Sequence, residues 1–136
     1  MKLTLLKVTL WTIGGFFCIG GLFLFIPSDW LHALAAWFMD AEALDQYWPV
    51  SPAFDYVVRA MIVMCLWIGV VLIVAAINPE KHRIQIDIAT GGLLVLAVVL
   101  PVAGVANGLP VWWYIGDTIF SAIAGLLLLA LRPGRG

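Results

Sequence analysis

The chain has 136 residues, of which 64% are hydrophobic and 11% charged. Soluble domains carry about 25% charged residues, and a mean hydropathy of +1.08 leaves too few polar residues to cover a water-soluble globule. The composition therefore excludes a soluble enzyme, and the net charge of −1 gives nucleic-acid binding no electrostatic basis. We expect an integral membrane protein that forms one transmembrane domain over residues 1–136, with the lipid bilayer as its first partner.

Four apolar segments are long enough to cross a membrane. A hydrocarbon core about 30 Å thick needs roughly 20 apolar residues in a helix. Segments at about 5–26, 56–77, 84–106 and 112–131 meet that length. Backbone polar groups in lipid must bond within their own segment, so each span is expected to be a helix. The sequence predicts an all-α fold, a four-helix bundle embedded in the membrane.

The basic residues indicate the orientation of the spans. Six of the seven lysines and arginines lie beside the first span, in the loop after the second span, or after the fourth span: Lys2, Lys7, Lys81, Arg83, Arg132 and Arg135. The positive-inside rule assigns that side to the cytoplasm. We therefore expect both termini to be cytoplasmic, in a bacterial inner (plasma) membrane.

The longest loop, at about 27–54, lies on the exoplasmic side under this prediction. Ser28 is a suitable N-cap residue for a helix, and apolar residues that include Trp30 and Trp37 recur at helical spacing. The pattern predicts a short helix at about 29–39 that lies in the membrane interface. Such a helix would act either as an anchor or as a lid over a pocket.

Arg59 is a basic residue inside a span, about 5 Å from the start of the second one. An unpaired arginine at this depth costs free energy, so we expect it to have a partner. Asp55 is one candidate, because it lies four residues earlier on the same helix face. Asp117 is the other, because it lies about 7 Å into the fourth span, at a matching depth. Pairing with Asp117 would join the second and fourth spans.

The same charged residues are also compatible with a polar pocket near the outer surface that binds an anion, a headgroup or a proton, since intramembrane ionisable groups often mark function. Asn107, His32 and Tyr114 lie on the same side and could extend its polar lining. The sequence has no recognisable catalytic constellation and no metal-ligand motif. It leaves open whether a cofactor binds.

Glycine pairs mark positions where helices can approach closely. They occur at Gly14-Gly15 and Gly20-Gly21 in the first span and at Gly91-Gly92 in the third, and the fourth span contains Ser121-x3-Gly125. Because the first and third spans both carry such a pair, the chain is compatible with two similar hairpins that form a parallel repeat. A chance likeness explains the same pattern.

A family resemblance rests on Arg59 and on the later run Gly108-Leu109-Pro110-x-Trp112-Trp113-x-x-Gly116-Asp117-x-x-Phe120. This pattern resembles the BphX-like and DoxX-like integral membrane proteins of bacteria, over roughly residues 56–131. The resemblance implies a four-helix bundle in a bacterial inner membrane and carries no agreed activity. An acidic residue at the position of Asp117 is common in that group, which implies that it pairs with Arg59.

Three functions are compatible with these features. The sequence favours a non-enzymatic accessory subunit or scaffold, which binds another membrane protein or associates with itself. The alternative is a transporter or a small anion- or lipid-binding protein that uses an Arg59/Asp117 pocket. An intramembrane enzyme would need Asp55 and Asp117 as a carboxylate pair whose pKa values differ, whereas Arg59 between them would keep both ionised.

Overall fold

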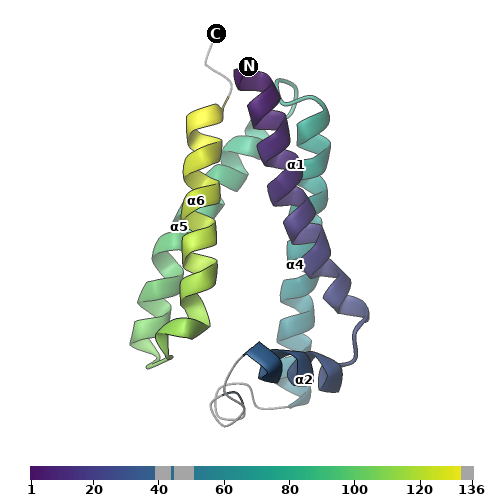
Figure 1. Ribbon diagram of the computed structural model, residues 1–136, viewed down its shortest axis with the longest axis vertical. Helices are drawn as coiled ribbons and strands as arrows, with labels where there is room; N and C mark the ends of the chain where they lie inside the picture. The colour runs from purple at the N-terminus through teal and green to yellow at the C-terminus, as the bar shows by residue number, and fades with distance from the viewer. Residues whose placement is uncertain (39–43, 45–50, 133–136) are drawn as a thin grey trace.

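The structure is a computed structural model that describes residues 1–38, 44 and 51–132. Four of its helices are long and apolar enough to span a membrane, over Lys2–Phe25, Asp55–Ile77, Arg83–Ala106 and Val111–Leu131. The four predicted spans are confirmed, with bounds that move by a few residues. The chain is thus a multi-pass membrane protein whose described part is an all-α bundle of four spans (Figure 1).

The first span is the helix α1 (Lys2–Gly21), which tightens into the short 3-10 helix η1 (Leu22–Phe25). A short helix, α2 (Ser28–Phe38), follows directly after Pro27. Its first turn is closed by the amides of Trp30 and Leu31, which both donate to the carbonyl of Pro27 at 3.0 Å. The predicted helix at 29–39 is therefore present, although residue 39 lies outside the described residues. Its location in the membrane interface stays a prediction.

The other spans are α4 (Pro52–Ile77), α5 (Arg83–Ala106) and α6 (Val111–Leu131). Helix α1 packs along α4, and α5 packs along α6, so the fold consists of two helical hairpins (Figure 1). The hairpins meet at the end that holds the start of α1 and the last turn of α6, here called the terminal end. They diverge towards the opposite end, where α2 lies, here called the distal end.

The two helices of the first hairpin touch through their backbones. A Cβ atom on Gly14 would lie 2.9 Å from the carbonyl oxygen of Gly69, and one on Gly69 would lie 2.8 Å from that of Gly14. Gly125 of α6 lies just as close to the side chain of Leu94 on α5. Small residues therefore allow the close packing inside each hairpin. Gly15 and the pair at 91–92 face open space instead.

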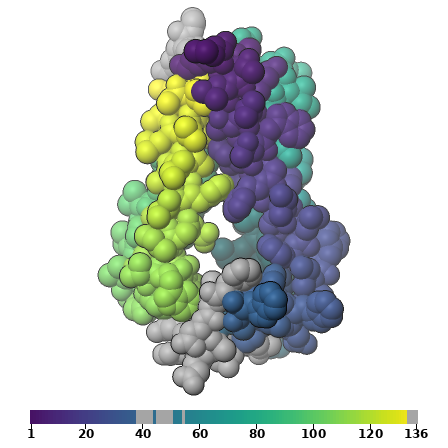
Figure 2. Space-filling model, viewed as in Figure 1, coloured from purple at the N-terminus to yellow at the C-terminus, as the bar shows by residue number. Residues whose placement is uncertain are grey.

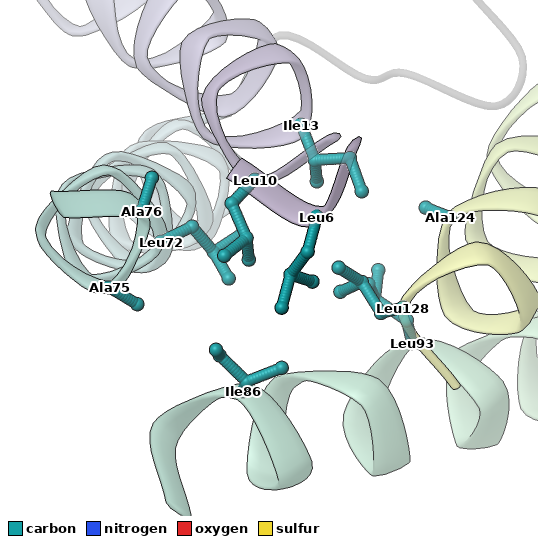
Figure 3. Packing of buried hydrophobic residues seen from close by; sticks show 10 residues of the cluster. All are labelled: Leu6, Leu10, Ile13, Leu72, Ala75, Ala76, Ile86, Leu93, Ala124 and Leu128. Atoms are coloured by element: carbon teal, nitrogen blue, oxygen red, sulfur yellow. The ribbon is translucent and has the colours of Figure 1, made fainter. Parts of the chain in front are cut away.

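One hydrophobic core joins the two hairpins at the terminal end (Figure 3). Its centre consists of large aliphatic side chains from all four spans, each at most 1% exposed: Leu6 and Leu10 of α1, Leu72 of α4, Ile86 of α5 and Leu128 of α6. Because lipid tails are as apolar as these side chains, close van der Waals packing between them, and not their removal from water, holds the spans together. The core therefore fixes the hairpins to each other at this end.

Candidate functional site

Arg59 on α4 is almost fully engaged in hydrogen bonds. Its Nε donates to the Asp55 carboxylate at 2.9 Å, and its Nη1 donates to the carbonyl of Leu24 at 2.9 Å. Its Nη2 donates to Ser28 Oγ at 2.9 Å and to the carbonyl of Ile26 at 3.4 Å. Four of the five N–H donors of the guanidinium thus have acceptors. We call these five residues the Arg59 clasp.

The clasp forms where the chain turns between η1 and α2. After η1 the backbone becomes extended at Ile26, with φ −88° and ψ 131°, and the next residue, Pro27, has no N–H to donate. Carbonyls at a helix end lack partners within the helix, and the guanidinium of Arg59 supplies donors to those of Leu24 and Ile26. The Ser28 hydroxyl also donates to Asp55. The clasp therefore holds this corner against α4.

The structure brings Arg59 together with Asp55 and does not bring it together with Asp117. Among the residues that the structure describes, the ion pair of Arg59 is formed with Asp55. Asp117 lies on α6, in the other hairpin, and the two hairpins diverge at this end (Figure 1). A similar depth along the helix axes therefore does not bring the two side chains into contact. The same separation leaves no basis for a carboxylate pair formed by Asp55 and Asp117.

Asp117 occupies the inner face of α6. The buried residues of this helix include Tyr114, Ser121 and Leu128, and Asp117 continues their spacing of three and four residues, which places it on the same stripe. Its side chain is nevertheless exposed. Within the described part of the chain it forms no hydrogen bond or ion pair. The carboxylate of Asp117 therefore has no partner among the described residues at this level of α6.

An aromatic contact between α1 and α6 lies one turn from Asp117, towards the terminal end. The ring of Phe120 lies 4.6 Å from that of Phe16 and 5.8 Å from that of Phe17, between ring centroids. Phe17 and Phe120 also pack against the terminal core. Beyond this contact the hairpins separate, and Figure 2 shows an opening between them in the distal half. Asp117 therefore stands where the opening begins.

A largely apolar pocket of about 430 Å³ lies between α4 and α5, with Phe17 of α1 in its wall. Cys65 and Trp67 line it from α4, and Gly92 lines it from α5. We call it the inter-hairpin pocket. Gln85 of α5 contributes a polar side chain to its described lining, which does not include Asp117.

Two of the other predicted lining residues make their contacts within the second hairpin, formed by α5 and α6. Tyr114 is buried, and its ring packs against the backbone of α5 at Gly104. Asn107 ends α5, where its Nδ2 donates to the carbonyl of Ala103 at 2.8 Å. Gly108 follows with a φ of +66°, and its amide donates back to α5, as that of the next residue does, which completes a Schellman motif. These residues shape the α5–α6 turn.

His32, the third predicted lining residue, lies half-buried on α2. The acidic loop residues Asp40, Glu42 and Asp45 lie outside the described residues. The sequence reasoning did not identify the inter-hairpin pocket, because its walls are apolar residues of the same kinds that face lipid.

No protein-family model, curated protein or solved structure matches the chain. The resemblance to the BphX-like and DoxX-like membrane proteins therefore stays a prediction.

Proposed function

We propose that this protein is a non-enzymatic membrane protein that binds a small apolar ligand in the inter-hairpin pocket. The observation that carries the proposal is the pocket itself, about 430 Å³ in volume and bounded by α1, α4 and α5. Ligand sites in proteins typically have volumes of about 300–1,000 Å³, with mainly apolar walls and a few placed polar groups. Gln85 of α5 is such a polar group in the lining of this pocket.

The Arg59 clasp does not support the anion-binding alternative. A site for an anion needs donors that are free to turn towards it, and four of the five donors of Arg59 are already bonded. Moving Arg59 to an anion would leave the carbonyls of Leu24 and Ile26 without these donors, next to an apolar environment where unpaired polar groups are expensive. Arg59 is therefore assigned a structural role.

Native mass spectrometry of the protein, extracted gently from its own membrane, tests the proposal. Gly92 lines the pocket, and a Cβ atom at this position would have no neighbour within 4 Å, so Gly92→Leu is expected to place its side chain in the pocket. Gly91→Leu is the matched control, because that position is equally open but is not among the lining residues. We expect a retained small-molecule mass in the wild type and in Gly91→Leu, and its loss in Gly92→Leu. The same mass in all three proteins would refute the proposal.

An accessory subunit or scaffold is the second candidate. Within the most apolar stretch of each span, 17% to 28% of the residues are buried, so lipid or another membrane protein must cover the rest. A second polypeptide retained in the same measurement, with no small-molecule mass, would favour this function over ligand binding. Self-association would appear as a multiple of the chain mass.

The proposed location is a bacterial inner membrane, with the terminal end in the cytoplasm. The basic residues support this orientation, because Lys2, Arg83 and Arg132 lie near one another at the terminal end, around one shared surface hollow. Positive charge in the loops on one side of a multi-pass protein favours the cytoplasmic location of that side. The family resemblance of residues 56–131 supports the same location.

A further inference from the structure

Three basic side chains line one surface hollow at the terminal end, which has a volume of about 350 Å³. They come from three separate parts of the chain, because Lys2 begins α1, Arg83 begins α5, and Arg132 directly follows α6. Glu80 and three leucines complete the lining. We call this feature the terminal hollow. Among the described residues it shares no lining residue with the inter-hairpin pocket, so it is a separate candidate site.

The three cations of the terminal hollow differ from Arg59, whose donors are already bonded. Within the part of the chain that the structure describes, none of the three side chains forms an ion pair or a hydrogen bond, although Glu80 lines the same hollow. Three positive charges therefore share the hollow with one carboxylate, and like charges repel each other. An anion in the hollow would relieve this repulsion and would meet donors that are free to turn towards it.

Two of the cations occupy positions that the helices by themselves disfavour. Lys2 and Arg83 are the first residues of α1 and α5, and the positive end of a helix dipole lies at its N-terminus. Neither helix begins with a side-chain cap, so the amides of its first turn lack this acceptor. An anion beside these residues would interact favourably with both helix N-termini as well as with the cations.

The terminal hollow lies at the edge of the membrane-spanning region. Lys2 and Arg83 are the first residues of their spans, and Arg132 comes directly after the last residue of the fourth span. Lipid headgroups flank the hydrocarbon core at this level. Leu3 of α1 and Leu131 of α6 add apolar side chains to the same lining. The hollow therefore suits a ligand that carries both an anionic group and acyl chains.

We infer that the terminal hollow binds the phosphate group of an anionic phospholipid, with Lys2, Arg83 and Arg132 as its charged partners. Arginine matches the geometry of a phosphate group by donating two parallel hydrogen bonds. Basic pockets between spans on the cytoplasmic side are typical sites for anionic headgroups. The positive-inside rule accounts for the side on which these cations lie, but it does not require that cations from three elements line one hollow.

Lipid binding by the purified full-length protein tests the inference. The protein in detergent is titrated with dioleoyl phosphatidylglycerol or with dioleoyl phosphatidylcholine, which have the same acyl chains and differ in headgroup charge. Native mass spectrometry counts the lipids that stay bound. We expect phosphatidylglycerol to bind the wild-type protein roughly tenfold or more tightly than phosphatidylcholine. Equal binding of the two lipids would overturn the inference.

Matched variants separate a built site from general attraction by positive charge. Lys2→Gln and Arg83→Gln should each weaken phosphatidylglycerol binding roughly fivefold. Lys7→Gln and Lys81→Gln remove the same charge from the same end of the protein at positions outside the lining, and they should leave binding unchanged. An equal loss in all four variants would show diffuse attraction in place of a site, and would overturn the inference.

Glu80→Gln gives a test of opposite sign. It removes the one carboxylate that lines the hollow, so it should strengthen phosphatidylglycerol binding and leave phosphatidylcholine binding unchanged. Circular dichroism checks that each variant keeps its helices. Weaker phosphatidylglycerol binding in a folded Glu80→Gln protein would contradict a phosphate group at this position.

Inorganic phosphate distinguishes a lipid headgroup from a soluble phosphate compound. Added at the same ionic strength as a chloride control, it should displace phosphatidylglycerol little better than chloride does, because it has no acyl chains to contact Leu3 and Leu131. Efficient displacement by phosphate alone, lost in the triple variant Lys2→Gln/Arg83→Gln/Arg132→Gln, would assign the hollow to a soluble phosphate compound and overturn the inference.

Discussion

Arg59 and Asp117 lie at similar depths in their helices, but their surroundings are opposite. Arg59 meets two backbone carbonyls, a hydroxyl and a carboxylate, because the chain breaks its helix at Pro27 directly beside it. Asp117 forms no hydrogen bond or ion pair with any residue that the structure describes, although Tyr114 and Ser121 lie on the same stripe of α6. The charge of Arg59 therefore stabilises the fold, whereas the charge of Asp117 has no partner among the described residues.

Two carboxamide variants should separate these roles. Asp55→Asn removes the charge that Arg59 and Ser28 bind, and it should lower the melting temperature in detergent by a small but measurable amount, because the pair is partly exposed and its bonds are screened. Asp117→Asn should leave stability unchanged or raise it, since no bond is lost. Thermal unfolding followed by circular dichroism measures both.

The double variant Arg59→Ala/Asp117→Asn serves as the control. Because the structure does not pair these residues, its change in stability should equal the sum of the changes in Arg59→Ala and Asp117→Asn. A loss from Asp117→Asn that vanishes in the Arg59→Ala background would show that the two residues interact.

At this scale the sequence predicts the need of Arg59 for a partner and names Asp55 among the candidates. The rule that a buried charge needs a partner and the spacing of four residues along a helix are both local. The sequence could not exclude Asp117 as the partner of Arg59, because depth in the membrane does not determine how far apart two helices lie. The sequence also could not predict the acceptors at Leu24 and Ile26, since they are backbone carbonyls exposed by the turn at Pro27.

The helices pair through glycines that carry no side chain at the point of contact. Gly14 and Gly69 approach each other so closely that each would place a Cβ atom against the other's carbonyl oxygen. Backbone atoms cannot rotate away as a side chain can, so the contact tolerates no larger residue. The first hairpin therefore depends on both glycines.

Gly69→Ala should lower the free energy of unfolding by about 1–3 kcal/mol, the usual effect of forcing an extra carbon into a packed interface. Gly15→Ala is the control, because a Cβ atom at that position has no neighbour within 4 Å. The control should keep or slightly raise the stability, since alanine favours a helix by about 1 kcal/mol over glycine. Equal melting temperatures for Gly69→Ala and Gly15→Ala would contradict the close contact.

The spans themselves could be predicted from the sequence, because hydrophobic length and turn residues are sufficient for that. The two glycine pairs of α1 identified a helix that packs closely, but not which member of each pair makes the contact, whereas the pair at 91–92 of α5 faces open space. Gly14 touches α4 and Gly15 does not, a difference of one residue and about 100° around the helix. Only the rotation of each helix about its axis decides it, and span length does not report that rotation.

The whole molecule consists of two tight hairpins that are joined at one end. The terminal core and the contact of Phe120 with Phe16 and Phe17 connect them, and the hairpins diverge beyond that contact. The opening in Figure 2 is therefore a property of the assembly and of neither hairpin alone. It could not be predicted from the sequence, since the angle between hairpins depends on how side chains of all four spans fill the core.

Phe120→Ala should loosen the hairpins relative to each other. It removes both ring contacts between α1 and α6, so the distance between spin labels at Val57 on α4 and Val111 on α6 should become more broadly distributed. Double electron–electron resonance measures this distance, with Cys18 and Cys65 replaced so that only introduced cysteines carry labels. Labels at Val105 and Val111, both in the second hairpin, should keep their distance.

Phe25→Ala is the matched control, because this aromatic side chain is 79% exposed and belongs to η1, away from the contact with α6. Its distance distributions should equal those of the parent protein. An unchanged distribution in Phe120→Ala would mean that the terminal core alone fixes the hairpin angle.

Because the hairpins are joined at one end, each acts as a lever with its pivot in the terminal core. Helix α5 has 24 residues, so a rotation of about 5° at the pivot moves its far end by about 3 Å over a length of about 36 Å. Core side chains such as Leu6 and Leu128 therefore set the width of the distal opening, although they do not line it. A change of one methylene group in the core should produce a larger displacement at the distal end.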